Sequence, residues 1–341
     1  MKRILCIVLL WLGACAAGPD APALEALVTL EPARETDAVA STGDAADDPA
    51  IWVHPTSPEQ SLVLGTDKRA GLYVYDMQGK TQQVLPAGRL NNVDIRQDVA
   101  LVGWSGDLAA ASNRTDDTVT LFSVNENGAA EIGRFASLRA EPYGFCLGRI
   151  DNKVYGFIAH KTGDLDMYRI DAADRGARVA TVKLKTQLEG CVHDDETGVL
   201  YLGEETRGVW RLETAADSIS APVLIDEIAG ASGLVADVEG LTLYNPEDGA
   251  GYLIASSQGD NSYAVYERQA PHRFLGRFRI ADGLNGDATE ETDGIDASSA
   301  PLGPDFPKGV LVVQDGMNAP AGQGQNFKYV DWRAVEEALG L

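Results

Sequence analysis

The sequence lacks the short motifs that identify several classes of hydrolases and redox proteins. It contains no Gly-x-Ser-x-Gly elbow, no His-Glu-x-x-His pair and no Cys-x-x-Cys pair. Its four histidines are scattered along the chain. The sequence therefore gives no support for a serine hydrolase, a zinc protease of the helix-motif type or a dithiol redox protein.

Positive charge is also scarce in this chain of 341 residues. Lysine and arginine total 28 against 51 aspartates and glutamates, which gives a formal net charge of -23. Such a surface repels nucleic acid and anionic lipid, so we expect neither as a partner. It attracts hard cations such as Ca²⁺, which prefer oxygen ligands.

The apolar run at the N-terminus is too short to cross a bilayer. Ile4 to Leu12 follow Lys2 and Arg3, which is the arrangement of an export signal. Leu12-Gly13-Ala14-Cys15 then matches a bacterial lipobox, which predicts a signal peptide over residues 1–14 and lipidation of Cys15. The alternative is an ordinary secretory signal in which Cys15 is incidental. We expect a tether over residues 15–34 and a lipid-anchored protein at the outer membrane, facing the periplasm or the cell surface.

The body of the chain repeats one pattern, in which a polar or acidic residue, often with a glycine nearby, precedes a short apolar strand. The copies are Asp47–Val53, Asn91–Ile95, Glu141–Leu147, Glu189–Val192, Asp237–Leu243 and Asp293–Asp296. Counted from Asp48, successive copies lie 44, 51, 46, 50 and 54 residues apart. Each copy is followed by two more apolar strands joined by a polar turn.

Units of this length with about four short strands are typical of propeller blades. We therefore expect an all-β protein, a six-bladed β-propeller over residues 35–341 with about four antiparallel strands per blade. A closed ring leaves no long exposed sheet edge and needs no partner strand, so we expect a monomer. A β-sandwich or a two-domain all-β protein is the alternative, but neither explains six copies in register. Helical periodicity is confined to Trp332–Leu341.

Equivalent residues of successive blades are expected to form rings around the central axis. The first ring consists of Asp47/Asp48, Asn92, Tyr143, Glu189, Asp237/Glu239 and Asp293. The second ring, at the turn between the next two strands, consists of Lys68/Arg69, Arg114, Lys161, Glu205, Asp260 and Asp315. In the second ring, blades one to three offer cations and blades four to six offer carboxylates.

This division of charge predicts a metal-dependent phosphate site. Crowded carboxylates repel one another and take up protons unless a counter-charge is bound. Ca²⁺ accepts several oxygens in loose geometry and would supply that charge. A phosphate group can bridge metal ions and bind lysine and arginine at once. A metal-activated water would then hydrolyse a phosphomonoester without a covalent intermediate.

Two cysteines, Cys146 and Cys191, lie outside the signal and its lipobox. The repeat places them on the inner strands of neighbouring blades. A disulfide is allowed in an oxidising compartment, but we expect two buried free thiols.

Several long segments resemble those of the β-propeller phytases, bacterial 3-phytases that release phosphate from myo-inositol hexakisphosphate (phytate). The segments are DDPAIWVHP (47–55), TDKRAGLYVYD (66–76), RLNNVDIR (89–96), AAASNR (109–114), EPYGF (141–145), LEG (188–190), DVEGLT (237–242), YLIASSQGDNSYAVY (252–266), TDGID (292–296) and VVQDGMN (312–318). The resemblance extends from Glu35 to the end of the chain.

The resemblance implies a role for each matching residue. Substrate phosphates would be contacted by Lys68, Arg69, Arg114, Tyr143 and Lys161. Active-site calcium ions would be held by Asp47, Glu189, Glu205, Asp237, Glu239 and Asp293. The catalytic residues among these would be Glu189, Glu205, Asp237 and Glu239, together with Tyr143. Structural calcium would be bound by Glu35, Asp48, Asp287 and Asn318. Arg69 stands where the family commonly has a second lysine, which changes a point charge into a planar fork.

The leading hypothesis is a calcium-dependent phytase that acts on a calcium–phytate complex, because the acidic chain would repel the free polyanion. Two alternatives stay open: another metal-dependent hydrolase on the same fold, and a non-enzymatic surface propeller that binds calcium and a partner. The first gives no reason for four cations to converge. The second is favoured if those cations lie on the outer rim.

Overall fold

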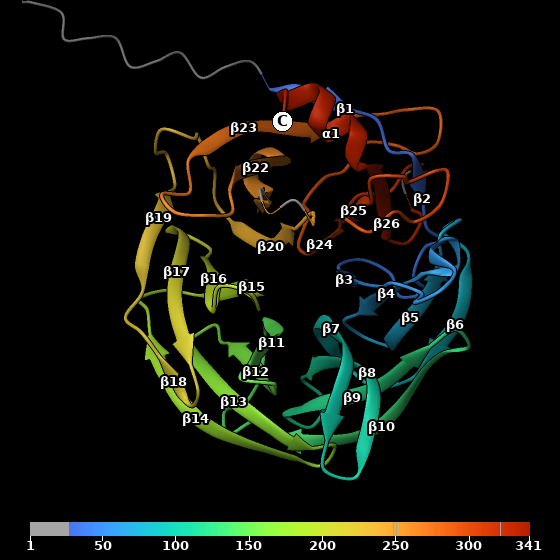
Figure 1. The fold of residues 1–341 in the computed structure, drawn as a ribbon. Helices are drawn as coiled ribbons and strands as arrows, with labels where there is room; N and C mark the ends of the chain where they lie inside the picture. Colours follow the sequence, from blue (N-terminus) through green and yellow to red (C-terminus); the bar gives the residue numbers. More distant parts are fainter. Residues whose placement is uncertain (1–26, 248, 250, 321) are drawn as a thin grey trace, which may run out of the picture.

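The computed structural model describes residues 27–247, 249, 251–320 and 322–341. Six β-sheets are arranged around a central axis as the blades of a propeller (Figure 1). The prediction of an all-β, six-bladed propeller is therefore confirmed. The expected signal peptide and the lipidation site at Cys15 lie outside the described residues.

Each blade begins with an inner strand near the axis and adds antiparallel strands toward the rim. Blades one to three consist of β3 (Ala46–Trp52), β4 (Leu62–Asp67), β5 (Gly71–Asp76) and β6 (Thr81–Leu85); β7 (Leu90–Leu101), β8 (Trp104–Asn113), β9 (Thr118–Asn125) and β10 (Gly128–Ala136); and β11 (Phe145–Ile150), β12 (Lys153–Ala159), β13 (Asp164–Ala172) and β14 (Arg175–Lys183). Blades four to six consist of β15 (Leu188–Asp194), β16 (Val199–Glu204), β17 (Gly208–Ala215), β18 (Ser218–Ile219) and β19 (Val223–Glu227); β20 (Val238–Tyr244), β21 (Tyr252–Ser257), β22 (Ser262–Glu267) and β23 (Phe274–Ile280); and β24 (Ile295–Ser298), β25 (Val310–Asp315) and β26 (Asn326–Asp331). Two 3₁₀ turns, η1 (Pro58–Gln60) and η2 (Gln258–Asp260), lie between strands. The inner strands coincide with the six copies of the sequence pattern.

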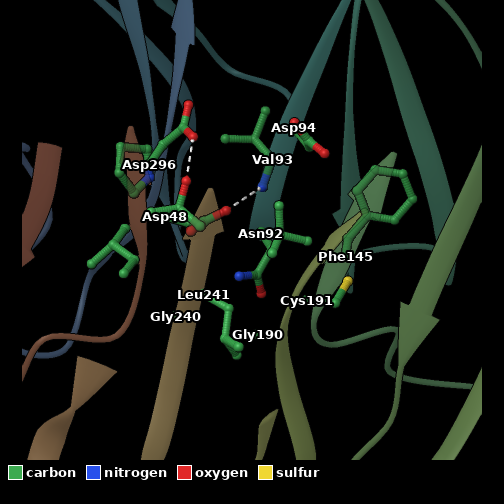
Figure 2. Close-up of a pocket in the computed structure, with 14 residues that line it drawn as sticks. Asp48, Asn92, Val93, Asp94, Phe145, Gly190, Cys191, Gly240, Leu241 and Asp296 are labelled. Atoms are coloured by element: carbon green, nitrogen blue, oxygen red, sulfur yellow. Dashed lines mark hydrogen bonds between the residues drawn. The ribbon is translucent and has the colours of Figure 1, made fainter. Parts of the chain in front are cut away.

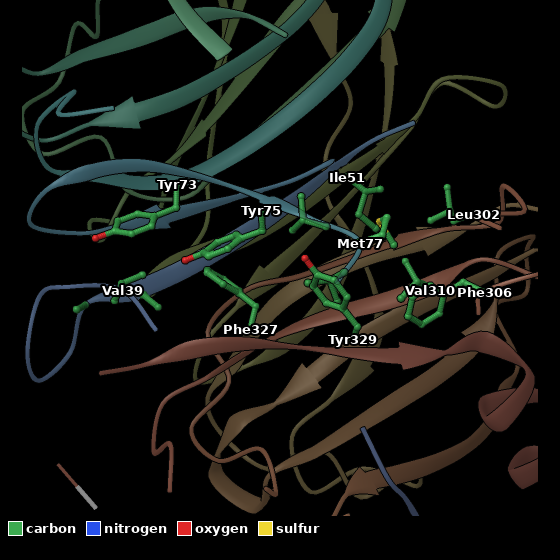
Figure 3. Close-up of a cluster of buried hydrophobic side chains, with 14 residues drawn as sticks. Val39, Ile51, Tyr73, Tyr75, Met77, Leu302, Phe306, Val310, Phe327 and Tyr329 are labelled. Carbon is green, nitrogen blue, oxygen red and sulfur yellow. The ribbon is translucent and has the colours of Figure 1, made fainter. Parts of the chain in front are cut away.

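The hydrophobic core lies between neighbouring blades. Every residue of β4 and of β25 is buried, because each sheet is covered on both faces by the adjoining blades. This explains why the middle strands are apolar throughout instead of alternating. Figure 3 shows the contact between blades one and six, where Tyr73 and Tyr75 of β5 lie near Phe327 and Tyr329 of β26.

The N-terminal segment completes the ring. β2 (Arg34–Glu35) pairs antiparallel with β26, so the outer strand of the last blade comes from the start of the propeller. β1 (Val28–Leu30) pairs in parallel with β23 of blade five. The sheets therefore begin before residue 35, where the sequence predicts that the tether ends, because the edges of two blades offer unpaired backbone groups to this segment.

The predicted C-terminal helix is present as α1 (Trp332–Leu339). The Asp331 side chain accepts a hydrogen bond from the Arg333 amide at the start of the helix, and Gly340 ends it in the left-handed conformation. The buried Trp332 stacks on Tyr244, with ring centroids 3.7 Å apart. Among the described residues, no helix has the length and apolar character needed to span a membrane.

Cys146 and Cys191 form a disulfide, so the prediction of two free thiols is wrong. Their inner strands β11 and β15 lie side by side, and the two Cα atoms are 5.7 Å apart, within the usual range for a disulfide. The repeat places the cysteines in neighbouring blades. It does not say whether the two side chains point toward each other, which the packing of the inner strands decides.

Candidate metal and phosphate site

The predicted ring residues gather on one face of the propeller, where the inner strands begin. A hollow of about 960 Å³ lies there. The predicted site residues that line it are Lys68, Tyr143, Glu205, Asp237, Glu239, Asp293 and Asn318. They come from blades one and three to six, so the repeat brings together residues that are far apart in the sequence.

A compact carboxylate cluster lies at the side of this hollow formed by blades four and five. Glu189, Glu205 and Glu239 are buried, and one oxygen atom of each lies within 4.8 Å of the others. Within the described part of the chain, Oε1 of Glu205 and Oε2 of Glu239 have no hydrogen-bond partner. Buried carboxylate oxygens without donors are costly, and a bound cation would remove that cost.

Burial shifts the protonation of this cluster. It raises the pKa of Glu189 to about 7, with the nearby charge of Asp47 adding to the effect. Burial likewise raises the pKa of Glu205 to about 6 and that of Asp293 to about 8, the latter against the opposing charge of Lys68. The pKa of Glu239 is raised well above its ordinary value by burial and by the Glu189 charge. Without a metal, the cluster therefore holds protons near neutral pH.

Lys68 is the counter-charge on the blade-one side of the hollow. Its Nζ lies 2.9 Å from Oδ1 of Asp47, 2.5 Å from Oδ2 of Asp293 and 2.6 Å from Oδ1 of Asp44. Asp47 is almost fully buried, so this ammonium group offsets one charge that water does not reach. The lysine links blade one to blade six across the point where the ring closes.

The remaining predicted cations divide into two groups. Lys161 and Arg114 lie against the Tyr143 ring, with the Lys161 Nζ 4.0 Å and the Arg114 guanidinium carbon 5.8 Å from the ring centroid. Burial, followed by the charges of Glu189, Asp47 and Glu239, raises the pKa of Tyr143, so its hydroxyl stays protonated and can donate a hydrogen bond. Arg69 is instead exposed, and its Nε donates to the backbone oxygen of Asp44, a residue that lines the hollow.

Glycines allow the ring residues of neighbouring blades to approach one another. A Cβ atom on Gly144 would lie 1.9 Å from the backbone oxygen of Glu189 in the next blade. A Cβ on Gly190 would lie 2.1 Å from the backbone oxygen of Glu239. Both distances are impossible for a real side chain, so the glycine of the repeat is a packing requirement of the site.

Three side chains that contact predicted site residues escape the sequence reasoning. Asn91 Nδ2 donates to Glu189 Oε1 at 3.3 Å, although the repeat singles out its neighbour Asn92. Gln258 Nε2 donates to Asp293 Oδ1 at 2.7 Å from the turn between β21 and β22, where the repeat singles out Asp260 instead. Asp44 precedes the first repeat copy. The paired asparagines of RLNNVDIR were a usable signal for Asn91, and the second ring pointed to the turn that contains Gln258, whereas Asp44 had no such signal.

Asp260 and Asp315 do not extend the carboxylate side of the second ring, which corrects the sequence expectation. Asp260 lies 2.7 Å from Arg277 Nη2 and accepts hydrogen bonds from two serine hydroxyls. Asp315 is fully buried, and its Oδ2 lies 3.2 Å from Lys328 Nζ. Local cations neutralise both residues, so of the three predicted carboxylates in that ring Glu205 lines the hollow and these two do not.

Three of the four residues predicted to bind structural calcium converge on one buried lysine. Lys328 Nζ lies 2.6 Å from Oε2 of Glu35 and 3.3 Å from Oδ1 of Asn318, and it also contacts Oδ1 of Asp287. The Lys328 side chain is fully buried. An ammonium group thus lies at the centre of this set of oxygens.

Asp48, the fourth, lies apart from that group, in a small hollow between the inner strands. Figure 2 shows it with Asp94 and Asp296 around this hollow. Each of the three accepts a hydrogen bond from a backbone amide of the next inner strand. The Val93 amide donates to Asp48 at 3.0 Å, the Leu147 amide to Asp94 at 2.8 Å and the Ile51 amide to Asp296 at 2.8 Å. These aspartates join blades six, one, two and three in sequence around the axis.

Comparison with known proteins agrees with the fold and with the family resemblance of the sequence. The family model described as Phytase matches residues 4–341. The 3-phytase of Bacillus subtilis (strain 168) is 42% identical over 326 residues, which cover 90% of this chain and 84% of that protein. Among solved structures, BBS1N in its complex with ARL6DN, soaked with lead, has a TM-score of 0.50 at 11% identity and covers 83% of this chain and 78% of its own, a likeness of fold alone. A protein of unknown function from Desulfotomaculum acetoxidans DSM 771 has a TM-score of 0.48 at 14% identity, over 70% of this chain and 74% of that one. This chain belongs to the phytase family, in its β-propeller form.

Proposed function

We propose that this protein is a phosphoric monoester hydrolase of the 3-phytase type, which releases phosphate from phytate in a calcium-dependent reaction. One observation carries the proposal: buried carboxylates and Lys68 line a single hollow on one face of the propeller, and Tyr143 of the same hollow contacts Lys161 and Arg114. Family membership and the related 3-phytase support the substrate and the reaction class.

The buried oxygens of the hollow fit calcium. Glu189, Glu205 and Glu239 offer oxygens close enough to share ions, and two of these oxygens have no donor among the described residues. The further carboxylates predicted to hold calcium are Asp47, Asp237 and Asp293, and the last two line the same hollow. When bound, calcium would neutralise these groups, bind phosphate oxygens and activate the attacking water.

The chain's own cations would hold the phosphate against this cluster. Neither Arg114 nor Lys161 is in an ion pair with a described carboxylate, so both are available to a phosphate group. Arg114 Nε is buried without a hydrogen-bond partner in the described chain. The protonated Tyr143 hydroxyl would donate to an oxygen of the substrate, and the ring fixes the two cations above it.

The net charge of the chain favours a calcium-neutralised substrate. A protein with a formal charge of -23 would repel free phytate over long distances. A calcium–phytate complex carries less negative charge and brings its own metal to the carboxylates. We therefore propose this complex as the species that binds.

We also propose structural calcium at Glu35, Asp287 and Asn318, although the metal does not fit beside the lysine as it stands. The Lys328 ammonium satisfies the same oxygens, so an ion could enter only if this side chain moved away.

The second part of the proposal is export and lipid anchoring at Cys15, supported by the lipobox alone. Radiolabelled palmitate should label the expressed protein and should not label Cys15→Ala.

The central test is phosphate release from phytate by the protein lacking residues 1–15, first with Ca²⁺ and then with excess chelator. Release that requires Ca²⁺ would support the substrate and the metal together. A folded protein that releases phosphate under neither condition would favour the calcium-binding surface propeller.

A further inference from the structure

The disulfide lies close along the chain to two residues of the candidate site. Cys191 of β15 is two residues after Glu189, a member of the carboxylate cluster. Cys146 of β11 is three residues after Tyr143, which lines the hollow. Extended chain rises about 3.3 Å per residue, so each cysteine is within roughly 10 Å of the site residue on its own segment.

Glu189 lies in a β-bulge of its own blade. β15 pairs with β16 at Leu188 and again from Cys191 onward, with a register shift between the two. Two residues of β15, Glu189 and Gly190, stand there opposite the single Gly203 of β16. A bulge re-aims a side chain but leaves it without a partner in the ladder. The position of Glu189 therefore depends on the anchors beside the bulge, and Cys191 is the first paired residue after it.

The bulge also contacts blade three. A Cβ on Gly144 would lie 1.9 Å from the backbone oxygen of Glu189, so the two chains touch at this point. Cys146 and Cys191 each follow the contacting residue by two positions, and their Cα atoms are 5.7 Å apart. Residues two apart in a strand lie on the same face. The disulfide therefore fixes the contact between Gly144 and Glu189 covalently.

Neighbouring inner strands are joined in other ways elsewhere in the ring. Asp48, Asp94 and Asp296 accept amide hydrogen bonds across the junctions of blades one and two, two and three, and six and one. Cys191 lines the same small hollow as these aspartates (Figure 2). The disulfide thus continues this series at the junction of blades three and four, and there the tie is covalent and lies beside the carboxylate cluster.

We propose that the Cys146–Cys191 disulfide is a positioning element of the candidate active site, which holds Glu189 at the spacing from Glu205 and Glu239 that calcium binding needs. The inference rests on the proposed function, because it assigns the disulfide a role in that site. Without the bond, the ladder and side-chain packing alone hold the bulge, so Glu189 occupies its binding position for less of the time. Calcium affinity falls by that fraction, and saturating calcium restores turnover.

The test compares Cys146→Ala/Cys191→Ala with wild type and with Leu311→Ala, all in the full chain. Leu311 is fully buried in β25 of blade six, so its truncation destabilises the propeller away from the carboxylate cluster. Calorimetry should show a calcium affinity about tenfold lower in the cysteine variant. The calcium concentration for half-maximal phosphate release from phytate should rise to match, with kcat at saturating calcium unchanged. Leu311→Ala should keep the wild-type calcium affinity.

Reduction makes the same comparison without a substitution. A phosphine reductant should shift the calcium dependence of wild type to that of the cysteine variant and should leave the cysteine variant unchanged. This arm starts from folded wild type, so it does not depend on the folding of the variant. In chelator, backbone amides of residues 188–192 should exchange hydrogen faster in the cysteine variant than in wild type or Leu311→Ala, a readout that needs neither metal nor turnover.

Equal calcium affinity in wild type, before and after reduction, and in the cysteine variant would overturn the inference and leave the proposed function intact. An equal loss of affinity in Leu311→Ala would overturn it as well, because the effect would then follow stability alone. If wild type bound calcium and lost affinity on reduction, but released no phosphate from phytate, the proposed function would fail while the positioning of the metal cluster stood.

Discussion

Gly190 of blade four lies so close to Glu239 of blade five that a Cβ on the glycine would be 2.1 Å from the glutamate's backbone oxygen. Gly190 directly follows Glu189, so this contact sets the distance between two members of the carboxylate cluster. The glycine therefore determines how closely the metal-binding edges of two blades can approach.

Gly190→Ala should push these two inner strands apart. We expect a loss of about 1–3 kcal/mol in the free energy of unfolding, since an added methyl in a packed contact forces the backbone to move. Calcium affinity should fall as well, because Glu189 and Glu239 would separate. Denaturant titration and calcium calorimetry measure the two effects. Wild-type calcium affinity in a destabilised variant would show that the cluster does not depend on this contact.

Glu205→Ala and Asp237→Ala should abolish turnover and leave the fold intact, because each residue offers metal ligands and neither packs the core. We expect kcat/KM to fall by at least about 100-fold, since loss of groups that only support metal ligands already costs 10- to 100-fold. Circular dichroism should match wild type. Glu126→Ala, an exposed carboxylate in the turn between β9 and β10, is the control. Near-normal activity in both site variants would refute the carboxylate model.

The stability of the metal-free protein should fall as pH rises through the pKa values of the buried carboxylates. In the folded protein the pKa is raised to about 6 for Glu205, about 7 for Glu189 and about 8 for Asp293. The ordinary pKa is 4.5 for a glutamate and 3.8 for an aspartate. Between the ordinary and the raised pKa values the folded state holds protons that the unfolded chain has released. Each increase in pH over this range therefore lowers the free energy of unfolding. Chelator-treated protein should therefore melt at a higher temperature at pH 5 than at pH 8.

Calcium should reverse this dependence, because the bound ion replaces the protons. Its affinity should increase with pH over the same range, and binding at pH 6 should release protons, which calorimetry in two buffers of different ionisation enthalpy detects. A metal-free melting temperature that rises from pH 5 to pH 8 would contradict the raised pKa values.

The disulfide between Cys146 and Cys191 should stabilise the ring at the junction of blades three and four. The two residues are 45 apart in sequence, and closing a loop of that length is worth about 2–4 kcal/mol. The denaturant midpoint of Cys146→Ala/Cys191→Ala should be lower than that of wild type. A reducing agent should lower the wild-type midpoint to that of the double variant. A reducing agent that shifts the double variant equally would assign the effect to another cause.

The sequence by itself determined the fold class, the number of blades and seven of the residues that line the hollow. Six copies of one pattern fold alike, so equivalent positions come to equivalent heights and radii around the axis. This symmetry alone brings Lys68, Tyr143, Glu239 and Asp293 to one hollow, although blades far apart in the chain supply them. No knowledge of side-chain direction is needed for that step.

The tertiary structure decided what depends on contacts between particular side chains. The repeat gives Asp260, Asp315 and Glu205 equivalent places, but Arg277 and Lys328 neutralise the two aspartates and leave the glutamate to the hollow. The pairing of Cys146 with Cys191 likewise depends on how two inner strands face each other. A repeat fixes the position of a residue around the axis. Its charge partner comes from a neighbouring strand or blade, and no single sequence pattern encodes the distance between the two side chains.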